Sequence, residues 1–285
     1  LYVGWIGGEI VFASELKALR LHPEWRHSVE PHALAWYFQV GYVPAPWSIH
    51  QGVYKLPAAT MISLSPIDAA SLPGINGFQS RLKRYWRMED VVAAARSQPW
   101  EGSHDEAMSA VQEALDASVR SKMMADVPVG ALLSGGIDST LVVASMARQS
   151  TAPVKTFTVG FDAGNGDESE SAARTAQYWG CEHHPLALRG QSALRLIERL
   201  PEVYDEPFAD AAQLPAILVS QALHEQVKVA LTGDGGDELF QGYQRYLDAS
   251  RNWRFLGRIP GPWRKALAGM VRHASTLTIR GRLAE

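Results

Sequence analysis

Apolar and polar residues alternate with a strand-like period at the start of the chain and with a helix-like period further along. Residues 1–6 and 9–13 flank Gly7 and Gly8, a pattern that is typical of a β-hairpin. We further expect a capped helical turn at residues 14–19, a helix that begins at its proline at residues 31–40, and a returning strand at residues 61–64. The first 65 residues are therefore predicted to be β-rich.

The pattern breaks between residues 66 and 103. Prolines, glycines and an asparagine interrupt any regular period until Glu101, and they stand at Pro66, Pro73, Gly74, Asn76 and Gly77. We predict no regular element here. The segment is interpreted as the connection between one domain at residues 1–65 and a second at residues 104–285.

From residue 104 onward, amphipathic helical segments alternate with short apolar ones. Helices are predicted at residues 105–124, 140–148, 169–179 and 214–225, and strands at residues 127–133, 154–161 and 227–231. Alternation of this kind is typical of a parallel sheet that helices cover on both faces. Ligands of such sheets bind beyond the carboxyl ends of the strands, and all three predicted strands end in glycine, aspartate or hydroxyl residues.

Composition excludes several classes of protein. The chain of 285 residues is 46% apolar and 20% charged, which excludes a disordered chain, and it has no uncharged apolar run near the ~18 residues of a membrane span. A net charge of −3 gives no pull toward nucleic acid or lipid, so we expect neither partner. Cys181 is the single cysteine, which excludes an internal disulfide and fits a cytoplasmic location. The basic stretch at residues 251–285 is interpreted as helical faces rather than as a nucleic-acid arm.

The first of two glycine-rich loops follows the predicted strand at residues 127–133. Gly135 and Gly136 let backbone N–H groups turn inward, and the next helix adds its positive N-terminal end. The hydroxyl groups of Ser134, Ser139 and Thr140 can donate hydrogen bonds. Asp138 is placed to hold Mg²⁺. The absence of a lysine and of a G-x-x-x-x-G-K-[ST] motif disfavours γ-phosphate transfer of the Walker kind. The loop predicts a polyanion site, and a plain helix-capping turn is the alternative.

The second loop follows the predicted strand at residues 227–231. Asp234, Asp237 and Glu238 lie within five residues and are separated by glycines, so a cation would relieve their repulsion. Alone, this loop could be a solvated acidic turn. Two such loops at matching strand ends favour one shared site for a polyanion and a divalent cation.

These motifs resemble those of the glutamine-dependent asparagine synthetases. LSGGIDST at residues 133–140 is similar to the pyrophosphate loop of ATP pyrophosphatases, and LTGDGGDELFQGY at residues 231–243 is similar to the second signature of the synthetases. Four more segments fit in the right order: FASELKAL at 12–19, GYVPAP at 41–46, KLP at 55–57 and DEPFAD at 205–210. The fold class implied is α/β, a parallel-sheet ATP-pyrophosphatase (adenine nucleotide α-hydrolase-like) domain after a β-rich remnant of an N-terminal-nucleophile glutaminase domain.

The resemblance implies an amide-forming ligase that uses ATP and Mg²⁺. Aspartate would attack the α-phosphate of ATP to give β-aspartyl-AMP and pyrophosphate, and ammonia, taken from glutamine in the full-length protein, would displace AMP. Asp138 and Asp237 match the magnesium-holding positions, and Asp234 matches a position where many members have glutamate, linked to forming the acyl-adenylate. The ATP-binding and pyrophosphate-binding positions implied are Leu133, Ser134, Gly135, Gly136, Asp138, Ser139, Thr140, Val159, Thr232 and Gly233. A homodimer is left open for the full-length form.

The chain also departs from the family pattern. Residue 1 is Leu1, where a member would begin with its cysteine nucleophile, and nothing after Tyr246 matches the lysine motif of the family. We therefore expect a fragment that lacks most of the glutaminase domain and the C-terminal end, and that cannot hydrolyse glutamine.

Three alternatives stay open. Cys181 with His183 and His184 could form a metal site or a Cys–His nucleophile pair. The family resemblance implies a strand at this position, which favours a structural role for these residues. A related amidotransferase or a β-lactam-synthetase-like enzyme could adenylate another carboxylate with the same loops. A non-catalytic module that only binds nucleotide is the third.

Overall fold

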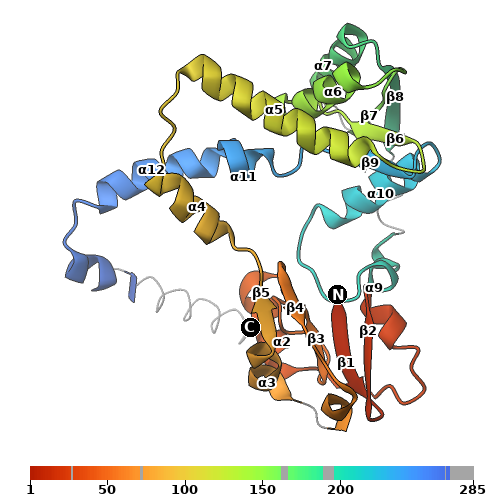
Figure 1. Ribbon diagram of the computed structural model, residues 1–285, viewed down its shortest axis with the longest axis vertical. Helices are drawn as coiled ribbons and strands as arrows, with labels where there is room; N and C mark the ends of the chain where they lie inside the picture. Colours follow the sequence, from red (N-terminus) through yellow and green to blue (C-terminus); the bar gives the residue numbers. More distant parts are fainter. Residues whose placement is uncertain (27, 71–72, 162–165, 189–195, 267, 270–285) are drawn as a thin grey trace, which may run out of the picture.

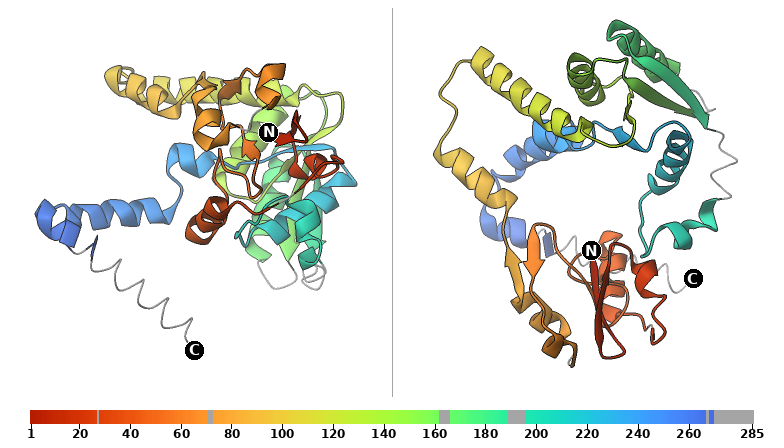
Figure 2. Two further views of the ribbon diagram at one scale, coloured as in Figure 1. Left: turned by 90° about the horizontal axis from the view of Figure 1, so that it is seen from below. Right: turned by 45° about the vertical axis from the view of Figure 1, so that its right-hand side comes forward.

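The computed structural model describes residues 1–26, 28–70, 73–161, 166–188, 196–266 and 268–269. A β-rich unit at the N-terminus and an α/β unit with a parallel sheet lie at opposite ends of the ribbon in Figure 1. Two segments link them: one holds α4 (Met88–Ser97) and leads into α5 (His104–Met123) of the α/β unit, and the other holds α9 (Leu200–Val203). Figure 2 shows the two connections on either side of the molecule.

The predicted N-terminal hairpin is confirmed. Strands β1 (Tyr2–Ile6) and β2 (Glu9–Ala13) pair antiparallel, and β3 (Val53–Lys55) adds to the other edge of β1. Gly7 and Gly8 form the turn with φ values of 59° and 81°, which a residue with a Cβ rarely adopts. The expected returning strand is β4 (Thr60–Ile62). This unit has an apolar core of its own, formed by Ile6, Leu16, Leu19, Ala33, Val43, Ile49 and Val53.

The two short helices of this unit begin in different ways. Helix α2 (Pro31–Val40) starts at its proline as predicted, and the Glu30 carboxylate accepts a hydrogen bond from the His32 N–H. The expected helical turn is α1 (Leu16–Leu19), but the prediction of a local cap is wrong, because the residue before it, Glu15, makes no side-chain capping bond. A distant carboxylate, that of Asp205, accepts from the first N–H groups of α1 instead.

The prediction that residues 66–103 hold no regular element is wrong. Its elements are the 3₁₀ turn η1 (Pro66–Ala70), α3 (Gly74–Ser80), β5 (Leu82–Arg84) and α4. Pro66 and Pro73 stand where each helical turn starts, and proline is tolerated there. Phe78 is fully buried and stacks on Tyr54 at 4.7 Å between ring centroids, while β5 pairs with β4. Long-range packing therefore orders a segment whose local pattern looks broken.

The α/β unit is built on a four-stranded parallel sheet with the order β8-β7-β6-β9. Three of the strands were predicted, and they are β6 (Val129–Leu132), β7 (Lys155–Phe161) and β9 (Val229–Leu231). The fourth, β8 (Glu182–Leu188), lies where the resemblance implies a strand. The predicted helices are confirmed as α5, α6 (Ile137–Gln149), α7 (Gly166–Tyr178) and α10 (Gln213–His224).

Helices cover both faces of this sheet, as expected. On one face, Ala131 and Leu133 pack against Val119 of α5, Val143 of α6 and Ala172 of α7. On the other face, a second apolar cluster joins β7 to α10 and to the segment before β9, through Phe157, Leu223 and Val227. Because the strands are parallel, their carboxyl ends lie at one edge of the sheet, between α6 and α10.

Two helices after the sheet were not predicted, α11 (Gly236–Phe240) and α12 (Gln244–Leu256). Part of the basic stretch at residues 251–285 lies outside the described residues. In the part of the chain that the structure describes, no helix has both the length and the apolar character that a bilayer span requires.

Candidate active site

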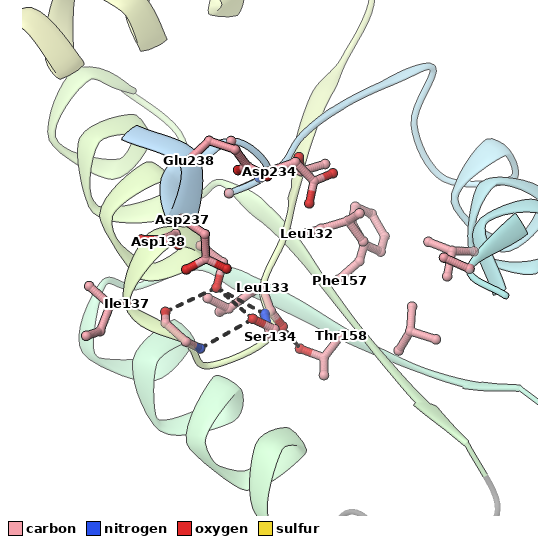
Figure 3. Close-up of a pocket in the computed structure, with 18 of the residues that line it drawn as sticks. Leu132, Leu133, Ser134, Ile137, Asp138, Phe157, Thr158, Asp234, Asp237 and Glu238 are labelled. Atoms are coloured by element: carbon pink, nitrogen blue, oxygen red, sulfur yellow. Dashed lines mark hydrogen bonds between the residues drawn. The ribbon is translucent and has the colours of Figure 1, made fainter. Parts of the chain in front are cut away.

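A cavity of about 770 Å³ lies at the carboxyl ends of β6, β7 and β9, within the usual range of ligand sites, about 300–1,000 Å³. Both glycine-rich loops line it, as Figure 3 shows. Ten of the twelve residues that the sequence points to lie in its wall; they are Leu133, Ser134, Gly136, Asp138, Ser139, Val159, Thr232, Gly233, Asp234 and Asp237. Gly135 and Thr140 belong to the first loop but are not in the wall.

Internal hydrogen bonds brace the first loop. The Ser139 hydroxyl accepts from the Ser134 N–H at 3.2 Å and lies 3.1 Å from the Ser134 hydroxyl, which accepts from the Gly136 N–H at 3.3 Å. Gly135 has φ +79°, a value that favours glycine. The helix N-terminus that follows has no side-chain cap, so the first N–H groups of α6 remain for a ligand or water. The serines thus shape the loop, and the helix end supplies the anion-binding groups.

The second loop packs directly on the first. A Cβ on Gly233 would lie 2.7 Å from the Ser139 nitrogen and 2.9 Å from the carbonyl carbon of Asp138, closer than real Cβ atoms approach. A Cβ on Gly236 would collide with the carboxylate of Asp138. These glycines are therefore required for contact between the loops, which brings Asp138 and Asp237 to the same part of the cavity (Figure 3).

The wall of the cavity is strongly acidic. It carries five carboxylates, and no lysine or arginine belongs to it among the residues described; the five are Asp138, Asp210, Asp234, Asp237 and Glu238. Within the described part of the chain, Glu238 is the one of the five that has a side-chain hydrogen-bond partner, because the Tyr243 hydroxyl donates to it at 2.7 Å. That bond is the main reason why the pKa of Glu238 is below its usual value, and Arg245, which lies 4.0 Å above the Tyr243 ring, lowers it further.

The donor set fits Mg²⁺ that arrives with a ligand. Asp138 and Asp237 line the same cavity, but the described residues contain no group of three or more aspartate, glutamate, histidine or cysteine side chains that could hold a metal by themselves. Mg²⁺ commonly binds through one or two carboxylates, with water and substrate phosphates completing its octahedron. A pair of carboxylates beside an anion-binding loop matches that arrangement.

The apolar part of the wall differs from the sequence-based expectation. Leu133 is only 1% exposed, and its side chain packs in the core between the sheet and α5 to α7, so its main chain faces the cavity. The Thr158 hydroxyl donates to the carbonyl of Leu133 and fixes it. Sequence reasoning missed several apolar and polar residues of the wall, including Leu132, Ile137, Phe157, Thr158, Ala212, Val219 and Tyr243.

Cys181 and the two histidines near it do not form a site. Cys181 packs beside the core of the α/β unit, and burial raises the pKa of its thiol, which makes the thiolate nucleophile scarce. His183 hydrogen-bonds the Thr156 hydroxyl at 3.0 Å, and His184 bonds Glu182 and stacks on Phe157. The described residues hold no cluster that could bind a metal here, which favours the structural role.

Most of the chain matches two known protein families. Residues 110–284 match the family described as asparagine synthase, and residues 1–73 match a glutamine amidotransferase domain. The chain belongs to the asparagine synthase family. Together with the parallel sheet, this membership confirms the expected fold class and the resemblance.

Relatives with curated descriptions agree over most of the chain. A putative asparagine synthetase [glutamine-hydrolyzing] 2 of Methanocaldococcus jannaschii is 32% identical over 265 residues, 91% of this chain and 47% of the relative. Asparagine synthetase [glutamine-hydrolyzing] 1 of Bacillus subtilis is 30% identical over 267 residues, 94% of this chain and 39% of the relative. Amidase chry2 of Gibberella zeae is 35% identical over 177 residues, 57% of this chain and 26% of the relative. The chain thus spans less than half the length of these relatives.

Proposed function

We propose that this chain carries the synthetase site of an ATP-dependent, amide-forming ligase that converts aspartate to asparagine. The observation that carries the proposal is the direct contact of two glycine loops at one acidic cavity, where an uncapped helix end faces two carboxylates. An anion-binding loop beside a carboxylate pair suits a triphosphate with its magnesium ion. Family membership supports the same activity.

In the proposed reaction, a side-chain oxygen of aspartate attacks the α-phosphorus of ATP and the bond to the β-phosphate breaks. Pyrophosphate leaves, β-aspartyl-AMP forms, and ammonia then attacks the acyl carbon, releasing AMP and a proton. Asp138 and Asp237 would hold Mg²⁺, which neutralises charge on the leaving pyrophosphate. Asp234 would act in forming the acyl-adenylate. The nucleotide would lie along the first loop, with Val159, Thr232, Gly233 and the main chain of Leu133 near the adenosine.

The whole protein is part of the proposal. We place a glutaminase portion at residues 1–65, a connection at 66–103 and the synthetase portion at 104–285. Glutamine would supply ammonia in the full-length protein. A homodimer and a cytoplasmic location stay predictions.

A related enzyme that adenylates another carboxylate is the second candidate, and the similarity to an amidase of Gibberella zeae favours keeping it. The two are separated by pyrophosphate release from ATP with a panel of carboxylic acids. Release that requires both ATP and aspartate supports the proposal and excludes a module that only binds nucleotide. Release with another acid but not with aspartate supports the second candidate. Rescue of an asparagine auxotroph by the full-length gene gives an independent answer.

Replacement of Asp138 tests the position of the metal. We expect Asp138→Asn to weaken magnesium-dependent ATP binding by about 10- to 100-fold, because one negatively charged ligand is lost from the metal. Calorimetric titration with ATP, with and without Mg²⁺, measures the change. Asp248→Asn on α12, outside the cavity wall, is the matched control and should bind ATP as the unmodified protein does. Unchanged binding in Asp138→Asn would mean that the site is misplaced.

A further inference from the structure

The N-terminal unit meets the rest of the chain at a short segment between α9 and α10. Among the described residues, the hydrogen bonds that join residues 1–84 to residues 104–269 all end on residues 203–209. Asp210 and Ala212, which follow along the chain, line the cavity of the candidate active site. The contact between the two units therefore lies directly beside one part of the cavity wall.

Glu206 makes the central bonds of this contact. Its carboxylate is largely buried, and its Oε1 accepts from the Ile49 N–H at 2.7 Å. The other oxygen, Oε2, pairs with Lys55 on β3 and accepts from the Tyr2 hydroxyl on β1 at 3.3 Å. Three donors from separate parts of the N-terminal unit thus converge on one carboxylate, which fixes its position closely.

Further hydrogen bonds lead from this contact to the start of α10. The Ala209 N–H donates to the Gly41 carbonyl of the N-terminal unit at 2.7 Å. The Phe208 carbonyl accepts from the side chain of Gln213 at 3.1 Å. Gln213 is the first residue of α10, and this helix start has no side-chain capping bond of its own. The position of the first turn of α10 therefore depends on residues 205–209.

The two parts of the cavity wall are fixed in different ways. The glycine loops are fixed within the α/β unit, because Gly233 packs directly on Asp138 and Ser139. The part at residues 210–212 is fixed from outside that unit, through the segment before it. Under the proposed function the loops hold the nucleotide, so residues 210–212 would lie on the side of the acceptor.

We propose that Glu206 is a positioning residue of the reaction: its bonds to the N-terminal unit hold residues 210–212 in place, so that the acceptor side of the cavity is complete only while the two units are docked. The inference rests on the proposed function and gives the N-terminal unit a task at the synthetase site. A shift of about 1 Å, caused far from the reacting atoms, can cost about 100-fold in rate. Glu206 touches no substrate in this role and acts through the segment that follows it.

Hydrogen exchange of the full chain tests this positioning without relying on activity. In Glu206→Ala, the amides of residues 213–216 should exchange about 10- to 100-fold faster, the usual effect of losing a hydrogen bond to a charged group. The amides of α6, at the other side of the cavity, should exchange as in the unmodified chain. Glu202→Ala, an exposed position on α9, is the matched control and should change neither region.

A second variant breaks the same link from its other end. Gln213→Met removes the donor to the Phe208 carbonyl and leaves every residue of the N-terminal unit unchanged. It should give the same regional increase in exchange, whereas Gln221→Met, at an exposed position of α10, should not. If Glu206→Ala does not fold, Gln213→Met decides the test.

Kinetics connect the position of the wall to the reaction. In both variants, kcat/KM for aspartate in pyrophosphate release should fall by about 10- to 100-fold through a higher KM. The Kd for ATP, measured by calorimetry, should stay unchanged, because the glycine loops are fixed within the α/β unit. A variant that is merely less stable would instead lose kcat with an unchanged KM.

The outcomes separate this inference from the proposed function. Faster exchange confined to the start of α10, with a higher KM for aspartate and unchanged ATP binding, supports the inference. Unchanged exchange, faster exchange in α6 and α10 alike, an unchanged KM for aspartate or weaker ATP binding overturns it. If the unmodified chain releases no pyrophosphate with any acid, the proposed function fails, and the exchange pattern still decides whether Glu206 positions the wall.

Discussion

Two acidic segments of the chain differ in whether their carboxylates have partners within the chain. In residues 205–209, which we call the strap, Asp205 and Glu206 are largely buried, with side-chain exposures of 9% and 10%, and each is satisfied by backbone N–H groups and by a lysine of its own. In the cavity, four of the five carboxylates have no cation beside them among the described residues. The burial of the Tyr2 hydroxyl beside Glu206 raises the pKa of Tyr2 well above its usual value, which also marks the strap contact as shielded from water.

This difference separates structural charge from charge directed at a ligand. Buried carboxylates persist only when hydrogen bonds and counter-charges compensate their desolvation, and the strap meets that requirement within the chain. The carboxylates of the cavity do not, and a cation or a cationic substrate would compensate them. Sequence composition cannot make this distinction, because DEP and DGGDE both look like acidic turns.

The largest expected effect comes from converting a satisfied carboxylate into an unsatisfied one. Lys55→Met removes the cation beside Glu206 and leaves a buried charge held by neutral donors alone. We expect the free energy of unfolding to fall by about 3 kcal/mol, the lower end for breaking a buried pair. Urea denaturation of the full chain measures it.

Lys83→Met, on the exposed strand β5, is the matched control and should change stability by less than about 0.5 kcal/mol. In the double variant Lys55→Met with Glu206→Gln, part of the lost stability should return, because no uncompensated charge remains. A loss below about 1 kcal/mol in Lys55→Met would mean that the strap pair behaves as a surface pair and that the contrast with the cavity is weaker than we describe.

The next effect concerns the contact between the two loops. In Gly233→Ala, the new methyl group would meet backbone atoms of Asp138 and Ser139, which cannot move aside as a flexible side chain can. We expect a stability loss of about 1–3 kcal/mol from overpacking and a loss of ATP binding, because the second loop must shift away from the first. Thermal unfolding and ATP titration measure the two effects.

Gly261→Ala provides the control, since a Cβ there meets no atom within 4 Å and the residue has no positive φ. It should leave both measurements unchanged. Normal ATP binding in Gly233→Ala would show that close contact of the loops is not needed for the site.

Local signals made much of the fold predictable from the sequence. The hairpin follows from two glycines at its turn, and the α/β order follows from alternating apolar periods. Contacts between distant segments were not predictable. The N–H groups at the start of α1 meet the carboxylate of Asp205, and burial of Phe78 against Tyr54 orders α3 in a segment full of prolines and glycines. Neither contact leaves a pattern among neighbouring residues.

The candidate site shows the same limit. Its glycine loops were predictable because each combines a strand end, glycines and carboxylates within a few residues. Asp210 was identified only as part of a segment similar to the family, with no role, and Phe157 was an ordinary strand residue. Their place in the wall depends on α10 packing across the sheet, which the sequence pattern does not specify.

The smallest expected effect concerns Glu238, which lines the cavity and yet has a protein partner. Tyr243→Phe removes the hydroxyl that donates to it, so its lowered pKa should rise toward the usual value. A pKa lowered by folding adds stability above the unfolded value of about 4.3, and this stability is lost as the pH falls through the folded pKa. The variant should therefore be less stable than the unmodified protein near neutral pH, and the difference should vanish in acid.

Carbon-13 NMR titration of the glutamate carboxyl groups follows the pKa directly, with the exposed Tyr85→Phe as control. An unchanged Glu238 pKa would place this residue with the unpartnered carboxylates of the cavity.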